Sequence, residues 1–186
     1  MSLYDWDDNE FPLAYLITIR TYGTWLHGDY RGSIDRHGLN IYGTPRINPN
    51  PKLLKMMQEE MRSPPFILNS EQRLAVHREI EDVCSRRAYY RRALNVRTNH
   101  LHAVITAAVK PGRIVNAFKS NATRALREQG LVDPDRRIWS LGKSRRYLWK
   151  PHHVDLAIDY SLYQQGDDLI DFDTWLELMG KAFDEE

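Results

Sequence analysis

Two predicted helices that enclose a predicted β-hairpin constrain the fold of this chain more than any other feature. The hairpin is expected because AYYRRALNV (88–96) and HLHAVITAAV (100–109) each resemble a strand and are separated only by the turn Arg97-Thr98-Asn99. The flanking segments carry apolar residues at helical spacing; Asn69 or Ser70 can cap the first helix, and Gly130 can end the second. The predicted ranges are 69–87 (helix), 88–96 and 100–109 (strands) and 112–129 (helix).

Further strands are predicted on both sides of this unit. Residues 14–22, AYLITIRTY, are rich in β-branched and aromatic side chains, and residues 138–141 and 145–149 resemble short strands. A last helix is expected over residues 151–166. This order predicts an α+β, ferredoxin-like βαββαβ fold, in which an antiparallel sheet carries two helices on one face. We expect the other face to be open to a substrate.

The length of 186 residues suits one domain with a tail. We expect a single domain over residues 1–166, in which residues 23–65 form a long irregular insertion after the first strand, because Gly, Pro and Asn recur there. Residues 52–62 are predicted to form a short helix inside the insertion. Residues 167–186 are interpreted as an acidic C-terminal extension that holds a short helix near 172–183.

The net charge of +1 conceals a strong asymmetry along the chain. Residues 1–83 carry nine Lys and Arg against twelve Asp and Glu, residues 84–150 carry sixteen against three, and residues 151–186 carry one against ten. The middle region therefore has a charge of +13, and the last region −9. A region this basic favours a polyanionic partner, since Lys and Arg that neutralise phosphates release counterions. The alternative is a solvated surface that the acidic tail balances.

Several classes of protein lose support from what the sequence lacks. Cys84 is the only cysteine, so no internal disulfide and no Cys-rich zinc site is possible, and a reducing cytoplasm is expected. No apolar run is long enough to cross a membrane, and the first residues lack the order of a secretion signal. The glycine-rich loops of ATP and dinucleotide enzymes and the motifs of serine hydrolases and zinc proteases are absent.

The most specific local motif is His100-Leu101-His102, within NVRTNHLHAVITA. Side chains alternate between the faces of a strand, so the two histidines point to one face with Cα atoms about 7 Å apart. Two neighbouring imidazoles can bind one divalent metal ion. The pair alone is weak support for a metal site, because many such pairs merely occupy a half-exposed strand.

The last predicted helix has two faces. Tyr160, Tyr163 and Gln164 are expected opposite the apolar face, and Tyr160 and Gln164 are one turn apart. A phenol beside an amide oxygen can supply a nucleophile and a metal ligand together. The alternative is that these tyrosines lie at the rim of the core. The residues expected on the apolar face are Val154, Ala157, Ile158 and Leu162.

Basic and aromatic residues alternate through the second half of the positively charged region. Such a pattern suits single-stranded nucleic acid, because cations contact the phosphates and aromatic rings stack on unpaired bases. The aromatic residues are Trp139, Tyr147 and Trp149, and at least one tryptophan is expected in the core instead. The candidates for DNA contact are Lys119, Arg124, Arg145, Arg146 and Lys150.

Taken together, these motifs resemble the IS200-like single-tyrosine transposases of the HUH endonuclease superfamily. The similarity is greatest to the branch of REP-associated tyrosine transposases, and it covers most of residues 14–166. The acidic end of the chain falls outside it. The stretches that carry the resemblance are AYLITIRTYGTWLHGD (14–29), NVRTNHLHAVITA (95–107), FKSNATRALRE (118–128), RRYLWKP (145–151) and AIDYSLYQQG (157–166).

The resemblance implies a role for each residue that matches the family motif. His100 and His102 match the histidines that bind a divalent metal ion, Mg²⁺ or Mn²⁺, Tyr160 matches the nucleophile and Gln164 the third ligand. Alternatives remain open, since Gln165 could replace Gln164 as ligand and Tyr163 is a second phenol nearby. Arg97 and Asn99 are assigned only to support or DNA contact.

The implied function is that of a metal-dependent transposase or endonuclease for single-stranded or hairpin DNA. It would cleave and rejoin DNA through a covalent 5′-phosphotyrosine intermediate, in the cytoplasm near the nucleoid, and we favour a homodimer. One alternative is a related HUH replication initiator or relaxase with the same chemistry. Another is a protein that binds single-stranded nucleic acid without cutting it, such as a domesticated transposase.

Overall fold

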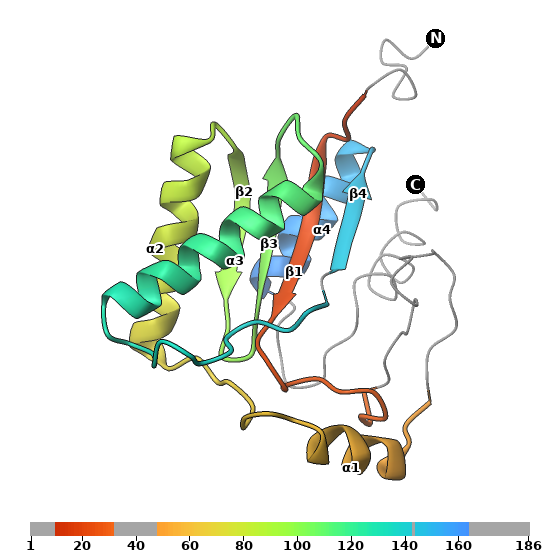
Figure 1. Cartoon of the computed structure of the whole chain (residues 1–186). Helices are drawn as coiled ribbons and strands as arrows, with labels where there is room; N and C mark the ends of the chain where they lie inside the picture. The colour runs from red at the N-terminus through yellow and green to blue at the C-terminus, as the bar shows by residue number, and fades with distance from the viewer. Residues whose placement is uncertain (1–9, 32–47, 143, 164–186) are drawn as a thin grey trace, which may run out of the picture.

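Four strands form one antiparallel sheet, in the order β2-β3-β1-β4, in the computed structural model of the chain (Figure 1). The structure describes residues 10–31, 48–142 and 144–163. The predicted α+β, βαββαβ arrangement is confirmed, with one further helix between β1 and α2 and one after β4. The elements are β1 (Ala14–Arg20), α1 (Pro51–Glu59), α2 (Ser70–Arg86), β2 (Tyr90–Val96), β3 (His100–Thr106), α3 (Pro111–Glu128), β4 (Ser144–Leu148) and α4 (Pro151–Tyr163).

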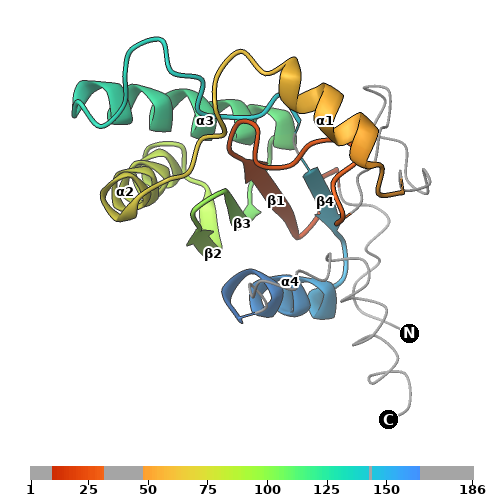
Figure 2. The same ribbon diagram turned by 90° about the horizontal axis from the view of Figure 1, so that it is seen from below.

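Helices cover both faces of the sheet, so the prediction of an open second face is wrong. Figure 2 shows α2 and α3 on one side and α4 on the other. The larger core lies under α2 and α3 and includes Ile17, Leu101 and Phe118. A smaller core lies under α4 and is formed by both sheet and helix residues. Because one side of α4 is apolar, packing that side on the sheet removes it from water.

The two ends of α2 show how local sequence sets the boundaries of a helix. At its start, the Asn69 side chain accepts a hydrogen bond from the Gln72 backbone N–H, and the Gln72 side chain accepts one from the Asn69 backbone N–H. At its end, Ala88 has a φ of 54°. The N–H groups of Ala88 and Tyr89 donate to the carbonyls of Ser85 and Cys84, which is the Schellman pattern that glycine usually completes.

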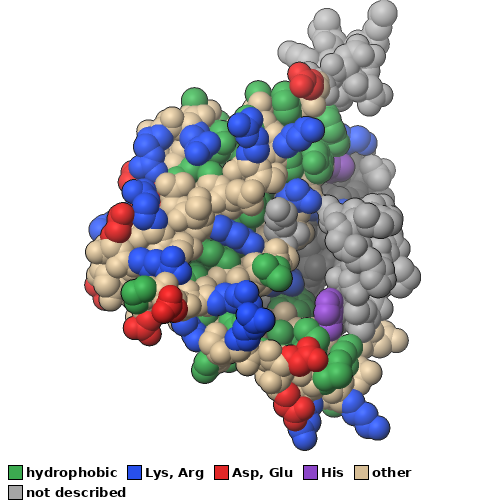
Figure 3. Space-filling model, in the orientation of Figure 1, with side chains coloured by type: hydrophobic (Ala, Val, Ile, Leu, Met, Phe, Trp, Pro, Cys, Tyr) green, Lys and Arg blue, Asp and Glu red, His purple; other side chains and the backbone are tan. Residues whose placement is uncertain are grey.

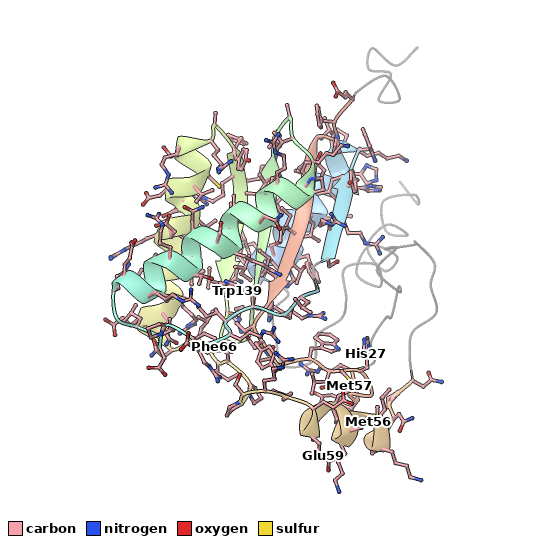
Figure 4. The ribbon with its side chains drawn as sticks, in the orientation of Figure 1. His27, Met56, Met57, Glu59, Phe66 and Trp139 are labelled. Atoms are coloured by element: carbon pink, nitrogen blue, oxygen red, sulfur yellow. The ribbon has the colours of Figure 1, made fainter. Side chains whose placement is uncertain are left out.

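The predicted strand over residues 138–141 does not form. The only strand-like contact there is an isolated bridge between Thr21 and Trp139. The Lys119 ammonium donates to the carbonyls of Ser140 and Gly142, so these carbonyls bond to a side chain of α3. The Trp139 indole packs against the larger core and donates to Lys119 O and to Thr123, as one tryptophan was expected to do (Figure 4).

The loop that follows β1 packs closely against the start of α1, in the region where His27 and Met57 are labelled in Figure 4. Gly28 has a φ of 88°, and a Cβ atom there would lie 2.5 Å from Asn50 O and 2.7 Å from Leu54 N. Only glycine therefore allows this approach of two backbones. The loop is fixed next to the end of β1, where the candidate active site lies.

No helix within the described ranges is both long and apolar enough to cross a membrane. The end of the last predicted helix, at residues 164–166, and the acidic extension at 167–186 lie outside the described residues.

Candidate active site

His100 and His102 lie side by side at the start of β3, as the alternation of a strand requires. Both are buried, and their ring centroids are 4.8 Å apart. In the β1–β3 register, His102 is opposite Thr18 and His100 is opposite Arg20. Because paired residues share a face, Thr18 and Arg20 lie on the same side of the sheet as the two imidazoles, which is the side that α4 covers.

The Tyr160 ring meets the His102 ring edge to face, with centroids 5.2 Å apart. Tyr160 is only 6% exposed and belongs to the smaller core. Its predicted position opposite the core is therefore wrong, since an aromatic ring packs as an apolar group even when it carries a hydroxyl. Tyr163, which was expected on nearly the same face, is 75% exposed. Leu162, expected in the core, is exposed too.

Each imidazole is oriented by a hydrogen bond at its Nδ1 atom. His100 Nδ1 is 2.6 Å from the Asn99 side-chain oxygen, and His102 Nδ1 is 2.9 Å from the Thr18 hydroxyl. An amide oxygen can only accept, so His100 donates from Nδ1 and the lone pair of the ring is on Nε2. Such a bond fixes both the tautomer and the direction in which Nε2 points.

Two further contacts hold the site together. The Asn99 backbone carbonyl accepts hydrogen bonds from the Thr21 N–H and hydroxyl and from the Thr24 hydroxyl, which ties the β2–β3 turn to the end of β1. On the other side of the site, Asn95 of β2 donates from its side chain to Ser161 O in α4, at 2.8 Å. The histidines and Tyr160 are thus held by elements that are themselves tied together.

Arg20 is a cation of this site that sequence reasoning did not single out. Its guanidinium lies 3.4 Å above the centroid of the Trp25 ring. Burial, and to a smaller extent the nearby Arg31, lower the pKa of Arg20 to about 10, although Tyr160 and Asp29 oppose the shift. With that pKa, Arg20 stays charged at neutral pH. Its electrostatic interaction with Tyr160 places a positive charge near the phenol.

The loop after β1 is stiffened by an ion pair. Asp29 is buried and accepts hydrogen bonds from Arg31 Nε at 2.8 Å and Nη2 at 2.7 Å. These bonds hold the pKa of the Asp29 carboxyl below its usual range. Arg31 also lies 4.5 Å from the centroid of the Trp25 ring, so two arginines contact one indole beside the histidine pair.

The two histidines could supply part of a metal site. Both would offer an imidazole nitrogen, a ligand that divalent transition ions accept readily. Within the part of the chain that the structure describes, no group of three or more His, Cys, Asp and Glu side chains gathers around one point. The expected third ligand, Gln164, and its alternative, Gln165, lie outside the described residues.

The residues predicted to contact DNA are distributed over the molecule. Lys119 donates to two loop carbonyls, and Arg124 pairs with Glu79 of α2 at 3.3 Å, so both link structural elements. Arg97 is exposed at the β2–β3 turn, near the site. The others belong to β4 or follow it: Arg145, Arg146 and Lys150. Figure 3 shows basic side chains outnumbering acidic ones along the face that α2 and α3 form.

Comparison with known proteins finds similarity to solved structures only. No family model and no curated protein matches the chain. A REP-associated tyrosine transposase bound to a REP hairpin is 14% identical, with 87% of this chain and 70% of that chain covered and a TM-score of 0.48. A candidate transposase from Deinococcus radiodurans R1 is also 14% identical, with 82% and 91% covered and a TM-score of 0.46. The first is named as a tyrosine transposase and the second only as a transposase.

Proposed function

We propose that this protein is a metal-dependent transposase or endonuclease of the single-tyrosine HUH type, which cleaves and rejoins single-stranded DNA through Tyr160. The observation that carries the proposal is the convergence of the rings of His100, His102 and Tyr160 on one face of the sheet. The three rings meet within a single chain, so a partner subunit is not needed to bring them together. A homodimer stays a prediction.

The donor set fits a divalent metal ion such as Mg²⁺ or Mn²⁺. His100 is held with its lone pair on Nε2, and Thr18 orients His102 from the adjacent strand. We propose these two residues, with Gln164 or Gln165, as the protein ligands. A bound ion would polarise a phosphate oxygen and orient the scissile bond.

Each step at Tyr160 forms one phosphorus–oxygen bond and breaks another, so the phosphate stays a diester throughout. The phenol oxygen forms a bond to the DNA phosphorus, the bond to the 3′-oxygen breaks, and that oxygen leaves as a hydroxyl carrying the proton. The 5′-phosphate is then held on Tyr160 until a 3′-hydroxyl attacks it in the reverse sense. No nucleotide cofactor is needed, in keeping with the absence of a phosphate-binding loop.

Arg20 supports this proposal because it places a positive charge near Tyr160, where negative charge develops during the reaction. Its guanidinium is within electrostatic reach of Tyr160, and Trp25 holds it from one side. A fixed cation stabilises both an ionised phenol and the phosphate that it attacks. The +13 charge of residues 84–150 would supply the general attraction for DNA, which depends on salt rather than on sequence.

A covalent adduct is the direct test of the proposal. The protein is incubated with Mn²⁺ or Mg²⁺ and a pool of single-stranded oligonucleotides that are labelled at the 3′ end, in which a hairpin adjoins a randomised segment. We expect labelled DNA to migrate with the protein on a denaturing gel. The adduct should be lost with EDTA and in Tyr160→Phe, whereas Tyr163→Phe is the matched control that should keep it.

Two outcomes would count against the proposal. An adduct that persists in Tyr160→Phe would assign the nucleophile to another residue. Binding of the pool without any adduct would favour the alternative of a protein that binds DNA and does not cut it. Tyr160→Phe should keep its unfolding temperature, because the packed ring remains and only a hydroxyl is lost.

A further inference from the structure

We propose that Tyr147 and Trp149, at the outer edge of the sheet, form an aromatic surface on which one unpaired base of the DNA substrate stacks. This rests on the proposed function for the identity of the ligand. It adds a site for a nucleobase that is separate from the His100, His102 and Tyr160 site and serves affinity rather than chemistry.

The rings of Tyr147 and Trp149 stack on each other and are nearly parallel. Their planes are 15° from parallel and their centroids are 6.5 Å apart. Nearly parallel rings at this centroid distance form an offset-stacked pair, so together they present one broad aromatic surface. Stacking on aromatic rings is the usual way in which proteins bind unpaired bases without reading their sequence.

The pair is exposed but held in place. Tyr147 is 48% and Trp149 38% exposed, which is unusual for large aromatic residues. Tyr147 is opposite Tyr15 in the β1–β4 register, and the buried Tyr15 ring packs against it edge to face with centroids 5.2 Å apart. Among the described residues, β4 pairs only with β1, so no other described strand covers this edge. The binding surface is therefore formed before a ligand arrives, which lowers the entropic cost of binding.

Cations suited to the phosphates adjoin the two rings. Arg145 precedes Tyr147 by two residues on the same face of β4, and its guanidinium approaches the start of α3 at Gly112. Its Nε atom is buried without a hydrogen-bond partner among the residues that the structure describes. Lys150 follows Trp149 directly and is exposed. Aromatic rings flanked by such cations favour a nucleic acid over an apolar peptide.

The position of the pair separates its role from that of the catalytic site. Tyr147 lies on the face of the sheet opposite His102, and Trp149 directly precedes Lys150 and the start of α4. Tyr160 is nine positions after Pro151 in α4, a distance of about 14 Å along the helix at 1.5 Å per residue. A base held at the pair thus belongs to a nucleotide several positions from the scissile phosphate.

An abasic scan tests the proposal without requiring cleavage. A hairpin oligonucleotide is selected from the same pool by its affinity for Tyr160→Phe protein in EDTA, and each unpaired nucleotide is then replaced in turn by an abasic one. We expect one position at which the loss of the base weakens binding about 10- to 100-fold. In the Tyr147→Ala/Trp149→Ala double variant, binding to the intact DNA should be weakened to the same extent, and that abasic position should have no further effect.

Matched variants keep the test decisive. Tyr90→Ala removes a tyrosine that is 65% exposed on β2, the opposite edge strand, and should leave binding unchanged. Tyr147→Leu keeps an apolar contact with Tyr15, so it tests the stacking face even where Tyr147→Ala fails to fold. The proposal is overturned if the rings can be removed without loss of affinity, or if the abasic effect persists in the double variant. A positive scan without an adduct would reject the cleavage chemistry and keep this base site.

Discussion

The rings of His102 and Tyr160 meet edge to face, with centroids 5.2 Å apart, although one residue is in a central strand and the other in the last described helix. The contact places the hydroxyl-bearing ring of α4 beside the histidine pair. It depends on α4 covering the second face of the sheet, where Val154 and Ala157 pack against sheet residues. The packing of an ordinary small core therefore assembles the candidate site.

We predict that Asn99→Ala weakens metal binding about 10- to 100-fold, the usual cost of losing a group that orients a ligand. Without the amide oxygen, the His100 ring is free to rotate and to change its tautomer. Calorimetric titration of the free protein with Mn²⁺ measures the effect without DNA. Asn99→Asp keeps an acceptor oxygen and should restore most of the affinity.

The control for this experiment is Asn116→Ala, an exposed change on α3 that should leave Mn²⁺ affinity as it was. Equal affinity in Asn99→Ala and the parent protein would show that this hydrogen bond does not position a metal ligand.

Replacing Ala88 with glycine should stabilise the protein by about 1 kcal/mol, because a non-glycine residue at positive φ is strained. Urea unfolding measures the change. Ala75→Gly, inside α2, is the opposite control and should cost at least about 1 kcal/mol, since glycine is unfavourable in a helix. Destabilisation by both substitutions would mean that Ala88 is not strained in the folded protein.

Deleting residues 167–186 should strengthen non-specific binding to single-stranded DNA at fixed salt. The deletion removes eight acidic residues and one lysine, so the negative charge that balances the basic middle region falls sharply. Fluorescence anisotropy at several salt concentrations measures the effect, which should be greatest at low salt. Unchanged affinity at low salt would show that the acidic extension does not compete with DNA.

The order of the helices and strands could be predicted because local patterns specify them. Asn69 and Gln72 mark the start of α2, and the turn at residues 97–99 separates β2 from β3. The segment at 138–141 could not be distinguished from a strand, because it makes only a single bridge to the residues after β1, and the Ser140 carbonyl bonds to the Lys119 ammonium of a distant helix. The coverage of the second face by α4 was missed for a related reason, since it depends on tertiary packing.

The candidate site could be predicted only in part. Alternation along a strand is enough to place His100 and His102 together, but the face of Tyr160 was assigned by treating tyrosine as polar. Arg20 and Thr18 were missed because their place beside the histidines depends on the β1–β3 register. Nothing in the residues next to Thr18 and Arg20 indicates which strand they face. The alternation of AYLITIRTY does place the two residues on one face of a predicted strand, and this was the only signal available.

Mass spectrometry of the covalent complex tests the central claim most directly. After digestion of the protein and trimming of the DNA, fragment ions that separate Tyr160 from Tyr163 show which residue carries the nucleotide. We predict that a 5′-phosphate is attached to Tyr160 alone, and only in protein that was supplied with the metal ion. A nucleotide on Tyr163 or on any other residue, or one attached through its 3′-phosphate, would contradict the account.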